Sequence, residues 1–181
     1  TDSPWADQKK FVEILKEMPL EEEERNQIFA GTAGEREDKS GAVIREILEA
    51  AGYEVAAQSL LPDEGEALKK ELIRLSDQVQ CDLVLTTGGT GFSRRDVTPE
   101  ATMAVAERNA PGIAEAIRAC SMTVTKRAML SRGVSVIRGG TLIINLPGSP
   151  KAVRESLEYV LDTLPHGLDI LSGRGGECAR R

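Results

Sequence analysis

The chain has 181 residues, enough for one domain with a sizeable hydrophobic core and few for two domains. Hydrophobic residues make up 40% and charged residues 29%, as in ordinary soluble globular proteins, and no apolar run is long enough to predict a membrane span. The charged N-terminus does not look like a signal peptide, and the three scattered cysteines fit neither a metal site nor a disulfide framework, so we expect a cytoplasmic protein that contacts no membrane.

The charge is unevenly distributed along the chain. The net charge is −6, but the segment from Gly88 to Gly140 holds eight Lys or Arg and four Asp or Glu, a local charge of +4, so the remainder carries −10. An acidic protein with one basic segment is poorly suited to wrapping nucleic acid, and we expect no nucleic-acid partner. The segment favours a focused site for a small anion, with scattered surface charge as the alternative.

The first 33 residues do not join the pattern of the rest of the chain. The stretch ADQKKFVEILKEM (6–18) looks helical, the four glutamates at 21–24 suit a solvated face or turn, and NQIFAG (26–31) is at best a short strand. The sequence therefore predicts an unplaced segment at 1–33, an α/β domain at 34–172 and a flexible tail at 173–181.

From Gly41 onward, amphipathic helices alternate with apolar strands. Ser40 is the expected N-cap and Gly52 the stop of the first of these helices, and Thr98 followed by Pro99 is expected to open a later one. Helices are expected at 41–52, 66–79, 100–108, 111–122 and 151–171, and strands at 53–63, 81–89 and 139–150. This alternation predicts an α/β fold of three layers, a mostly parallel sheet with helices on both faces.

The loop after the second of these strands, LTTGGTGFSRRDVTPEAT (85–102), is the clearest functional candidate. In parallel sheets, ligands bind beyond the carboxyl ends of strands, where this loop lies. Its glycines leave backbone N–H groups open to an anion, and Arg94 and Arg95 offer guanidinium forks for phosphate oxygens. A generic strand-to-helix turn is the alternative for the glycines alone.

Two aspartates suggest a divalent cation in the same region. Asp96 stands among phosphate-binding donors, and Asp63 also follows an expected strand end; Mg²⁺ binds through one or two carboxylates together with phosphate oxygens and water. The alternatives are a helix cap or an arginine partner for Asp96, and a Pro-Asp turn for Asp63. His166, the only histidine, has no nucleophile signature near it and is expected at a helix end or on the surface.

Three longer stretches, GEREDKSG (34–41), DLVLTTGGTGFSRRDVTPEAT (82–102) and AMLSRGVSVIRGGTLIINLPGSP (128–150), resemble the molybdopterin-binding family of molybdenum cofactor synthesis. The family includes molybdopterin adenylyltransferases and the related domains of gephyrin and its plant homologues. The resemblance implies a three-layer α/β domain, a homotrimer, and transfer of AMP from Mg-ATP to molybdopterin with release of pyrophosphate. It also suggests a molybdate-inserting enzyme as a partner for the product.

The resemblance also assigns residues. Asp63 and Asp96 match the family's acidic residues for catalysis and Mg²⁺, and Asp38 and Ser40 match its nucleotide-end element. Residues expected to bind molybdopterin are Gly88, Gly89, Thr90, Gly91, Ser131, Asn145, Pro147 and Gly148.

The sequence departs from the family pattern in two places. The family's first strand and its aspartate have no counterpart before residue 34, and Arg94 replaces a frequent proline. The first departure affects one wall of the nucleotide site, and the second is a milder change that adds charge. A non-catalytic trimeric molybdopterin carrier or scaffold, which would differ at the nucleotide and metal end, is the alternative function. A generic nucleotide-binding α/β protein fits the glycine loop but not the two later stretches.

Overall fold

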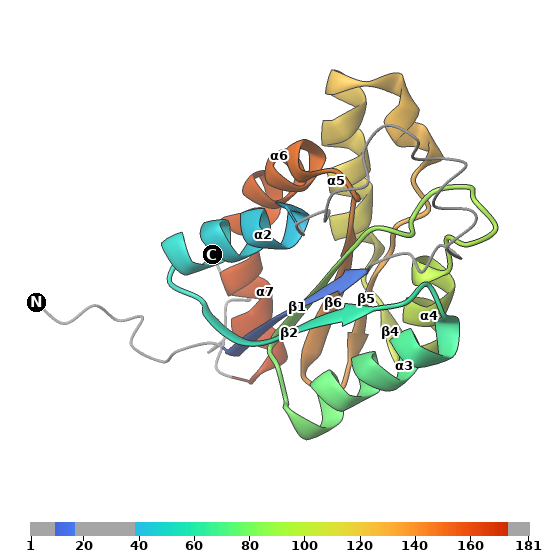
Figure 1. Cartoon of the computed structure of the whole chain (residues 1–181). Coiled ribbons are helices and arrows are strands. Elements are labelled where there is room, and N and C mark those ends of the chain that lie inside the picture. Colours follow the sequence, from blue (N-terminus) through green and yellow to red (C-terminus); the bar gives the residue numbers. More distant parts are fainter. Residues whose placement is uncertain (1–9, 17–38, 174–181) are drawn as a thin grey trace, which may run out of the picture.

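The structure is a computed structural model that describes residues 10–16 and 39–173. These residues form a six-stranded mixed sheet with flanking helices (Figure 1). The strand order is β2-β1-β3-β6-β5-β4. The pairs β1–β2, β1–β3 and β3–β6 are parallel, whereas β5 runs antiparallel to both β6 and β4. The strands are β1 (Lys10–Lys16), β2 (Glu54–Leu61), β3 (Leu83–Thr87), β4 (Arg108–Asn109), β5 (Ser135–Arg138) and β6 (Thr141–Leu146).

Helices cover both faces of this sheet, which gives the expected three layers (Figure 1). On one face lie α2 (Lys39–Ala50), α5 (Pro111–Val124), α6 (Pro150–Leu161) and α7 (Leu164–Leu171). On the other lie α3 (Gly65–Ile73), its π-helical continuation η1 (Arg74–Gln78) and α4 (Thr98–Val105). A 3₁₀ turn, η2 (Lys126–Leu130), follows α5. The α/β fold class predicted from the sequence is confirmed.

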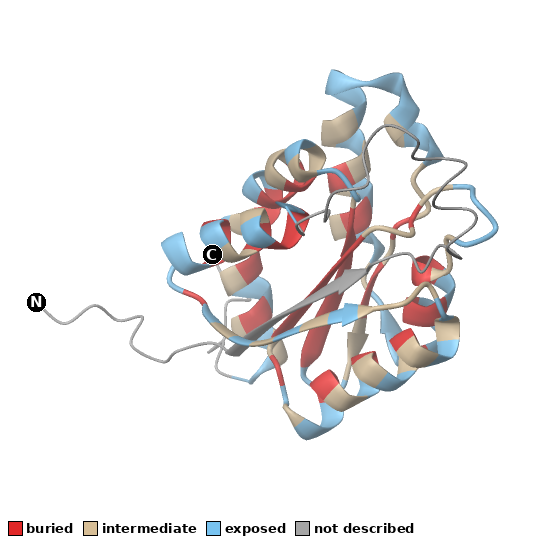
Figure 2. Cartoon of the chain, viewed as in Figure 1, coloured by how far each residue is buried: buried red, intermediate tan, exposed pale blue. Residues whose placement is uncertain are grey.

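The core is aliphatic, as expected from an aromatic content of 3%. Every residue of β3 and of β6 is buried, and Figure 2 shows these strands in the buried class between the helical layers. By contrast, burial alternates along β2, which lies at the edge of the sheet. Central parallel strands are covered on both faces, so their sequences are mainly apolar, while an edge strand keeps exposed polar positions.

The first strand corrects an expectation. Residues 6–18 look helical in sequence, but Lys10–Lys16 form β1, which pairs with β2 on one side and β3 on the other. Its apolar positions, Phe11, Val12, Ile14 and Leu15, suit a helix face or a strand covered on both sides equally well. Pairing on both edges satisfies the strand's backbone groups, and this tertiary contribution decides between the two structures that the local pattern allows.

Most of the other expected elements are confirmed, with changes at their ends. Gly52, at φ +83°, ends α2 through hydrogen bonds from its own N–H to Glu49 and from the Tyr53 N–H to Leu48. Ser40 lies one residue inside α2 instead of capping it, and Thr98 is the first residue of α4, with Val97 as its cap.

The C-terminal helical pattern divides in two. The stretch expected as one helix at 151–171 forms α6 and α7, because the chain turns at Asp162 and Thr163 and Pro165 opens the second helix. The sequence prediction also missed the short strands β4 and β5, which pair with each other at the other edge of the sheet.

Some expectations fall outside the described residues. These are the glutamates at 21–24, the short strand at 26–31, Asp38, and the tail beyond Gly173. Within the described ranges, the helices are all too short or too polar to cross a membrane. The division of the chain at residues 33 and 172 stays a prediction.

Candidate functional site

The candidate site lies where β3 and β6 end. The parallel strands β2, β1, β3 and β6 point the same way, so the segments after them meet at one edge of the sheet. From β1, the chain proceeds to β2 on one side and later to β3 on the other, with α2 and α3 on opposite faces. The strand order thus reverses between β1 and β3, the place where open α/β sheets bind ligands.

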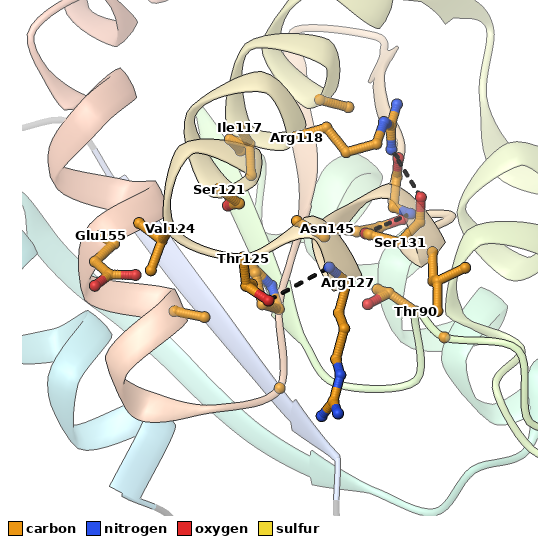
Figure 3. Close-up of a pocket in the computed structure, with 18 residues that line it drawn as sticks. Thr90, Ile117, Arg118, Ser121, Val124, Thr125, Arg127, Ser131, Asn145 and Glu155 are labelled. Carbon is orange, nitrogen blue, oxygen red and sulfur yellow. Dashed lines mark hydrogen bonds between the residues drawn. The ribbon is translucent and has the colours of Figure 1, made fainter.

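A cavity of about 310 Å³ opens at this edge, beneath α5 and η2 (Figure 3). Six of the eight residues expected to bind molybdopterin line it: Thr90, Gly91, Ser131, Asn145, Pro147 and Gly148. The other two, Gly88 and Gly89, immediately precede Thr90 but are not in the lining. The structure therefore brings together three loops that are far apart in the sequence.

The rest of the lining was not anticipated from the sequence. It comes largely from α5 and η2, with an apolar side formed by Ile117, Val124 and Leu130 and charged groups from Arg118, Arg127 and Glu155. A largely apolar wall with a few placed polar groups suits a flat heterocycle bearing an anionic substituent. The two arginines belong to the basic segment noted in the sequence, which could have directed attention to them.

The glycine loop takes conformations that favour glycine. Gly88 and Gly89 have φ of +86° and +62°, in the left-handed region that other residues rarely adopt. Thr98, fully buried at the start of α4, holds both: its hydroxyl donates to the Gly88 carbonyl at 2.9 Å and its N–H to the Gly89 carbonyl at 3.2 Å. The residue expected as a helix cap thus fixes the loop.

The glycine loop packs directly on the Pro-Gly turn after β6. A Cβ placed on Gly148 would lie 3.3 Å from the Gly88 Cα, so a side chain there would press the two loops apart. Thr87 donates its hydroxyl hydrogen to the Pro147 carbonyl at 2.6 Å, and Ser40 donates its own to the Gly148 carbonyl at 2.9 Å. Ser40, expected at the nucleotide end, therefore ties α2 to this turn.

Asp96 faces the glycine loop. Its Oδ2 accepts a hydrogen bond from the Ser93 N–H at 2.9 Å and lies 2.9 Å from the position that a Cβ on Gly91 would take. Asp96 does not cap α4, because Val97 holds that position. Hydrogen bonding to the loop backbone thus sets the position of this carboxylate.

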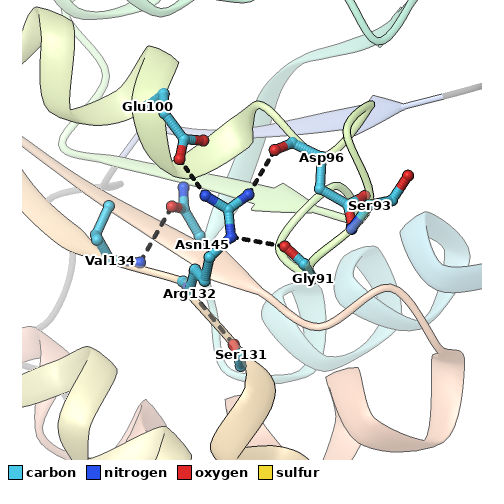
Figure 4. Close-up of polar contacts among 9 residues, drawn as sticks. Gly91, Ser93, Asp96, Glu100, Ser131, Arg132, Val134 and Asn145 are labelled. Carbon is cyan, nitrogen blue, oxygen red and sulfur yellow. Dashed lines mark hydrogen bonds and ion pairs between the residues drawn. The ribbon is translucent and has the colours of Figure 1, made fainter.

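Arg132 was missed by the sequence analysis, although it follows Ser131 in a stretch that carries the resemblance. Its Nε donates to the Gly91 carbonyl at 2.6 Å and its Nη2 to the Asp96 carbonyl at 2.5 Å, while Nη1 pairs with Glu100 (Figure 4). Its backbone N–H donates to the Thr90 carbonyl at 2.8 Å.

Asn145 lines the cavity, but its amide is used within the protein. Its Nδ2 donates to the hydroxyls of Thr86 and Thr102, both at 2.9 Å, and its Oδ1 accepts from the Val134 N–H at 3.2 Å. Asn145 is 3% exposed. Its contribution to the site is to hold β6, β3 and α4 together beneath the cavity.

Asp63 follows β2. One strand, β1, lies between β2 and β3, so β2 and β3 are about 10 Å apart at the usual strand spacing. Neither Asp63 nor Asp96 lines the cavity. In the residues that the structure describes, no cluster of three or more His, Cys, Asp or Glu could hold a metal ion. Mg²⁺ is commonly bound in proteins by one or two carboxylates together with substrate phosphates and water, so a magnesium role for these two aspartates stays a prediction.

The remaining features predicted from the sequence are as follows. Arg94 and Arg95 are exposed in the loop between the glycines and α4, and His166 is exposed on α7, as expected of a surface histidine. Cys81 is buried and Cys120 is half-buried, and within the described residues neither forms a disulfide. Asp38 lies outside the described residues.

Comparison with known proteins places the chain among molybdenum cofactor proteins. Residues 16–166 match the model of a probable molybdopterin binding domain. The chain is 44% identical over 147 residues to the molybdopterin adenylyltransferase of Helicobacter pylori strain J99, covering 77% of this chain and 81% of that protein. It is 46% identical over 132 residues to the Escherichia coli K12 molybdopterin adenylyltransferase, covering 66% of this chain and 68% of that one.

The fold has solved counterparts. The crystal structure of the molybdopterin biosynthesis enzyme MoaB from Thermus thermophilus superposes with a TM-score of 0.76 at 46% identity, covering 90% of this chain and 96% of that chain. The family match and these identities agree with the resemblance drawn from the sequence.

Proposed function

Because this chain belongs to the probable molybdopterin-binding domain family, we propose that it is a molybdopterin adenylyltransferase of molybdenum cofactor biosynthesis. The reaction transfers AMP from ATP to the terminal phosphate of molybdopterin and releases pyrophosphate. The observation that carries the proposal is the cavity at the end of β3 and β6, whose lining contains six residues that the family resemblance assigns to molybdopterin.

The chain's own groups suit such a transfer. The reaction needs no protein nucleophile, because the substrate phosphate attacks the α-phosphorus of ATP, and catalysis depends on positioning and charge stabilisation. The glycine loop offers backbone N–H groups held in place by Thr98 and Arg132. The apolar side of the cavity, including Ile117 and Leu130, suits the pterin ring, and Arg127 supplies positive charge beside it.

The acidic residues are assigned to the metal end. We assign Asp96 and Asp63 as the residues that would hold Mg²⁺, which when bound neutralises phosphate charge. Asp96 supports this role because its carboxylate is fixed beside Gly91 through the Ser93 N–H. Asp63 lies beyond the carboxyl end of the edge strand β2, and this end is at the same edge of the sheet as the carboxyl ends of β3 and β6.

The test uses purified protein, molybdopterin and Mg-ATP, with pyrophosphate release as the readout. The wild-type chain is expected to release pyrophosphate only when molybdopterin is present. Molybdopterin binding without this release would instead identify the carrier or scaffold that was the alternative function.

Removing either proposed metal ligand is the second arm of the test. Asp96→Asn and Asp63→Asn are expected to lower turnover by at least about a hundredfold while the fold is retained, since an amide loses the charge but keeps the shape. Asp162→Asn, on the exposed residue after α6, is the matched control and should keep wild-type turnover. Wild-type turnover by either Asp96→Asn or Asp63→Asn refutes that residue's role.

Further features of the proposal rest on the family resemblance. They are a homotrimeric assembly, a cytoplasmic location, and delivery of the adenylylated product to a molybdate-inserting enzyme. Ser40, with Asp38 before it, is assigned to the nucleotide end, and its hydroxyl already contacts the Pro-Gly turn of the cavity. Sedimentation of the purified protein measures the assembly state directly.

A further inference from the structure

We propose that Arg132 is a positioning residue that fixes the glycine loop and the Asp96 carboxylate for the transfer. The inference rests on the proposed function, because the loop and Asp96 have their roles there. Arg132 itself is outside the cavity lining, so it acts through its neighbours.

The contacts of Arg132 span the loop from end to end. Its backbone N–H holds the Thr90 carbonyl, and its Nε and Nη2 hold the carbonyls of Gly91 and Asp96. The residues between these anchors are exposed, and Phe92 is 69% exposed, so their own packing does little to fix the segment. The loop is therefore held mainly at its two ends, and one side chain reaches both ends (Figure 4).

Only arginine can make this set of contacts. Three nitrogens of one rigid, planar group donate in three directions, two to loop carbonyls and one to the Glu100 carboxylate. Glu100 lies in the first turn of α4. It neutralises the guanidinium and links it to the helix that follows the loop. A lysine ammonium is a compact point charge and cannot reproduce this geometry.

The position of the Asp96 carboxylate depends on the same anchors. Its Oδ2 is held by the Ser93 N–H within a turn that the Asp96 N–H closes on the Ser93 carbonyl at 3.0 Å. This turn spans the exposed stretch between the Gly91 and Asp96 carbonyls. Release of Arg132 would leave the turn intact but free to move as a unit. The carboxylate would then lose its place relative to the cavity.

Arg132 also adjoins a residue that lines the cavity. Ser131, which precedes Arg132, lines the cavity, and its carbonyl accepts a hydrogen bond from Arg118 on α5 at 3.1 Å. Arg132 thus joins the segment carrying Ser131 to the glycine loop. Arg132 therefore helps to set the position of the Ser131 segment relative to the glycine loop.

The experiment compares Arg132→Gln and Arg132→Lys with Arg138→Gln. Arg138 is a matched control because it is also partly buried and also donates to a main-chain carbonyl, that of Val105, and to a carboxylate, that of Asp77. It lies in β5, away from the glycine loop. The measurements are pyrophosphate release as a function of Mg²⁺ and molybdopterin, amide hydrogen exchange of residues 88–98, and thermal unfolding.

Arg132→Gln is expected to lower kcat by about tenfold to a hundredfold, as for partners that orient ligand-binding groups, with a smaller change in KM for molybdopterin. The Mg²⁺ concentration for half-maximal rate should rise, and exchange of residues 88–98 should accelerate by at least about tenfold. Arg132→Lys should fall between Arg132→Gln and wild type. Arg138→Gln should lower thermal stability without changing kcat or Mg²⁺ dependence.

Two results overturn the inference. One is unchanged exchange of residues 88–98 in both Arg132 variants. The other is a loss of activity that follows the loss of folded protein and leaves kcat per folded molecule and Mg²⁺ dependence at wild-type values. Failure of the proposed function is distinguishable, because the wild-type chain itself would then release no pyrophosphate, while the exchange measurement would still report whether Arg132 holds the loop.

Discussion

At the scale of single residues, the site depends on how closely groups pack around the glycine loop. Gly88 and Gly89 need left-handed backbone angles, whereas Gly91 has an ordinary φ and is constrained only by space. A methyl group there would meet the Asp96 Oδ2 at 2.9 Å, closer than real Cβ contacts allow. The loop thus requires glycines for two different physical reasons.

Gly91→Ala should therefore displace the Asp96 carboxylate without straining the backbone. We expect turnover to fall by about tenfold to a hundredfold, since small misplacements of reacting groups are costly. Thermal stability should change little. Gly140→Ala is the control, because a Cβ there would meet nothing within 4 Å. Equal turnover of the two variants in the pyrophosphate assay would show that the position of Asp96 is unimportant.

At the scale of elements, polar contacts join the edge strand to the helix that follows it. The Ser59 hydroxyl on β2 donates to the Glu71 Oε1 at 2.6 Å, and Arg74 donates to both Glu71 carboxylate oxygens at 2.7 and 2.8 Å. Arg74, and to a smaller extent Ser59, hold the pKa of Glu71 below its ordinary value of 4.5, although burial opposes them. The ionised form of Glu71 therefore stabilises the packing of α3 on β2.

This contact predicts a pH dependence of stability. Because the pKa of Glu71 is lower in the folded state, its stabilisation is fully present above about pH 4.5, the unfolded value, and is lost as the pH falls through the folded pKa. Glu71→Gln should remove this contribution, so its free energy of unfolding should fall less on acidification than that of wild type. Urea unfolding between pH 3 and 7 measures it.

Glu66→Gln on the same helix is the control for this prediction. Its side chain is 88% exposed and pairs with the nearby Lys69, so its removal should leave the pH profile of unfolding close to that of wild type. If Glu71→Gln and Glu66→Gln gave the same profile, the contact between β2 and α3 would make no specific contribution.

At the scale of the whole molecule, β1 determines where the site can form. It lies between β2 and β3 and pairs with both, so the hydrogen-bonded sheet is continuous from β2 to β3 only through β1. The Ile14 backbone lies opposite Ser59 on one neighbour and Thr86 on the other. Loss of this strand would interrupt the sheet between β2 and β3 and destabilise the edge at which the cavity lies.

Ile14→Pro should therefore destabilise the protein by about 1 to 3 kcal/mol, because proline removes a ladder N–H, leaves its carbonyl partner unsatisfied and is found essentially only at sheet edges. Ile14→Val keeps the N–H and the branched side chain, and serves as the control. Circular dichroism and urea unfolding of the two variants measure the difference. A proline variant as stable as the valine variant would show that β1 is not a central strand.

The sequence by itself determined the fold class, the parallel strands β2, β3 and β6, and two stretches, 82–102 and 128–150, that supply residues to the cavity lining. Continuous apolar runs, glycine stops and prolines in first helical turns are local signals, and they identify such elements wherever they occur. Only the tertiary structure decided that Lys10–Lys16 is a strand, since its pattern fits a helix equally well and pairing on both edges settles it. It also decided that Thr98 and Arg132 fix the glycine loop and that Asn145 joins three elements, because hydrogen bonds between residues far apart in the chain leave no periodic trace in the sequence.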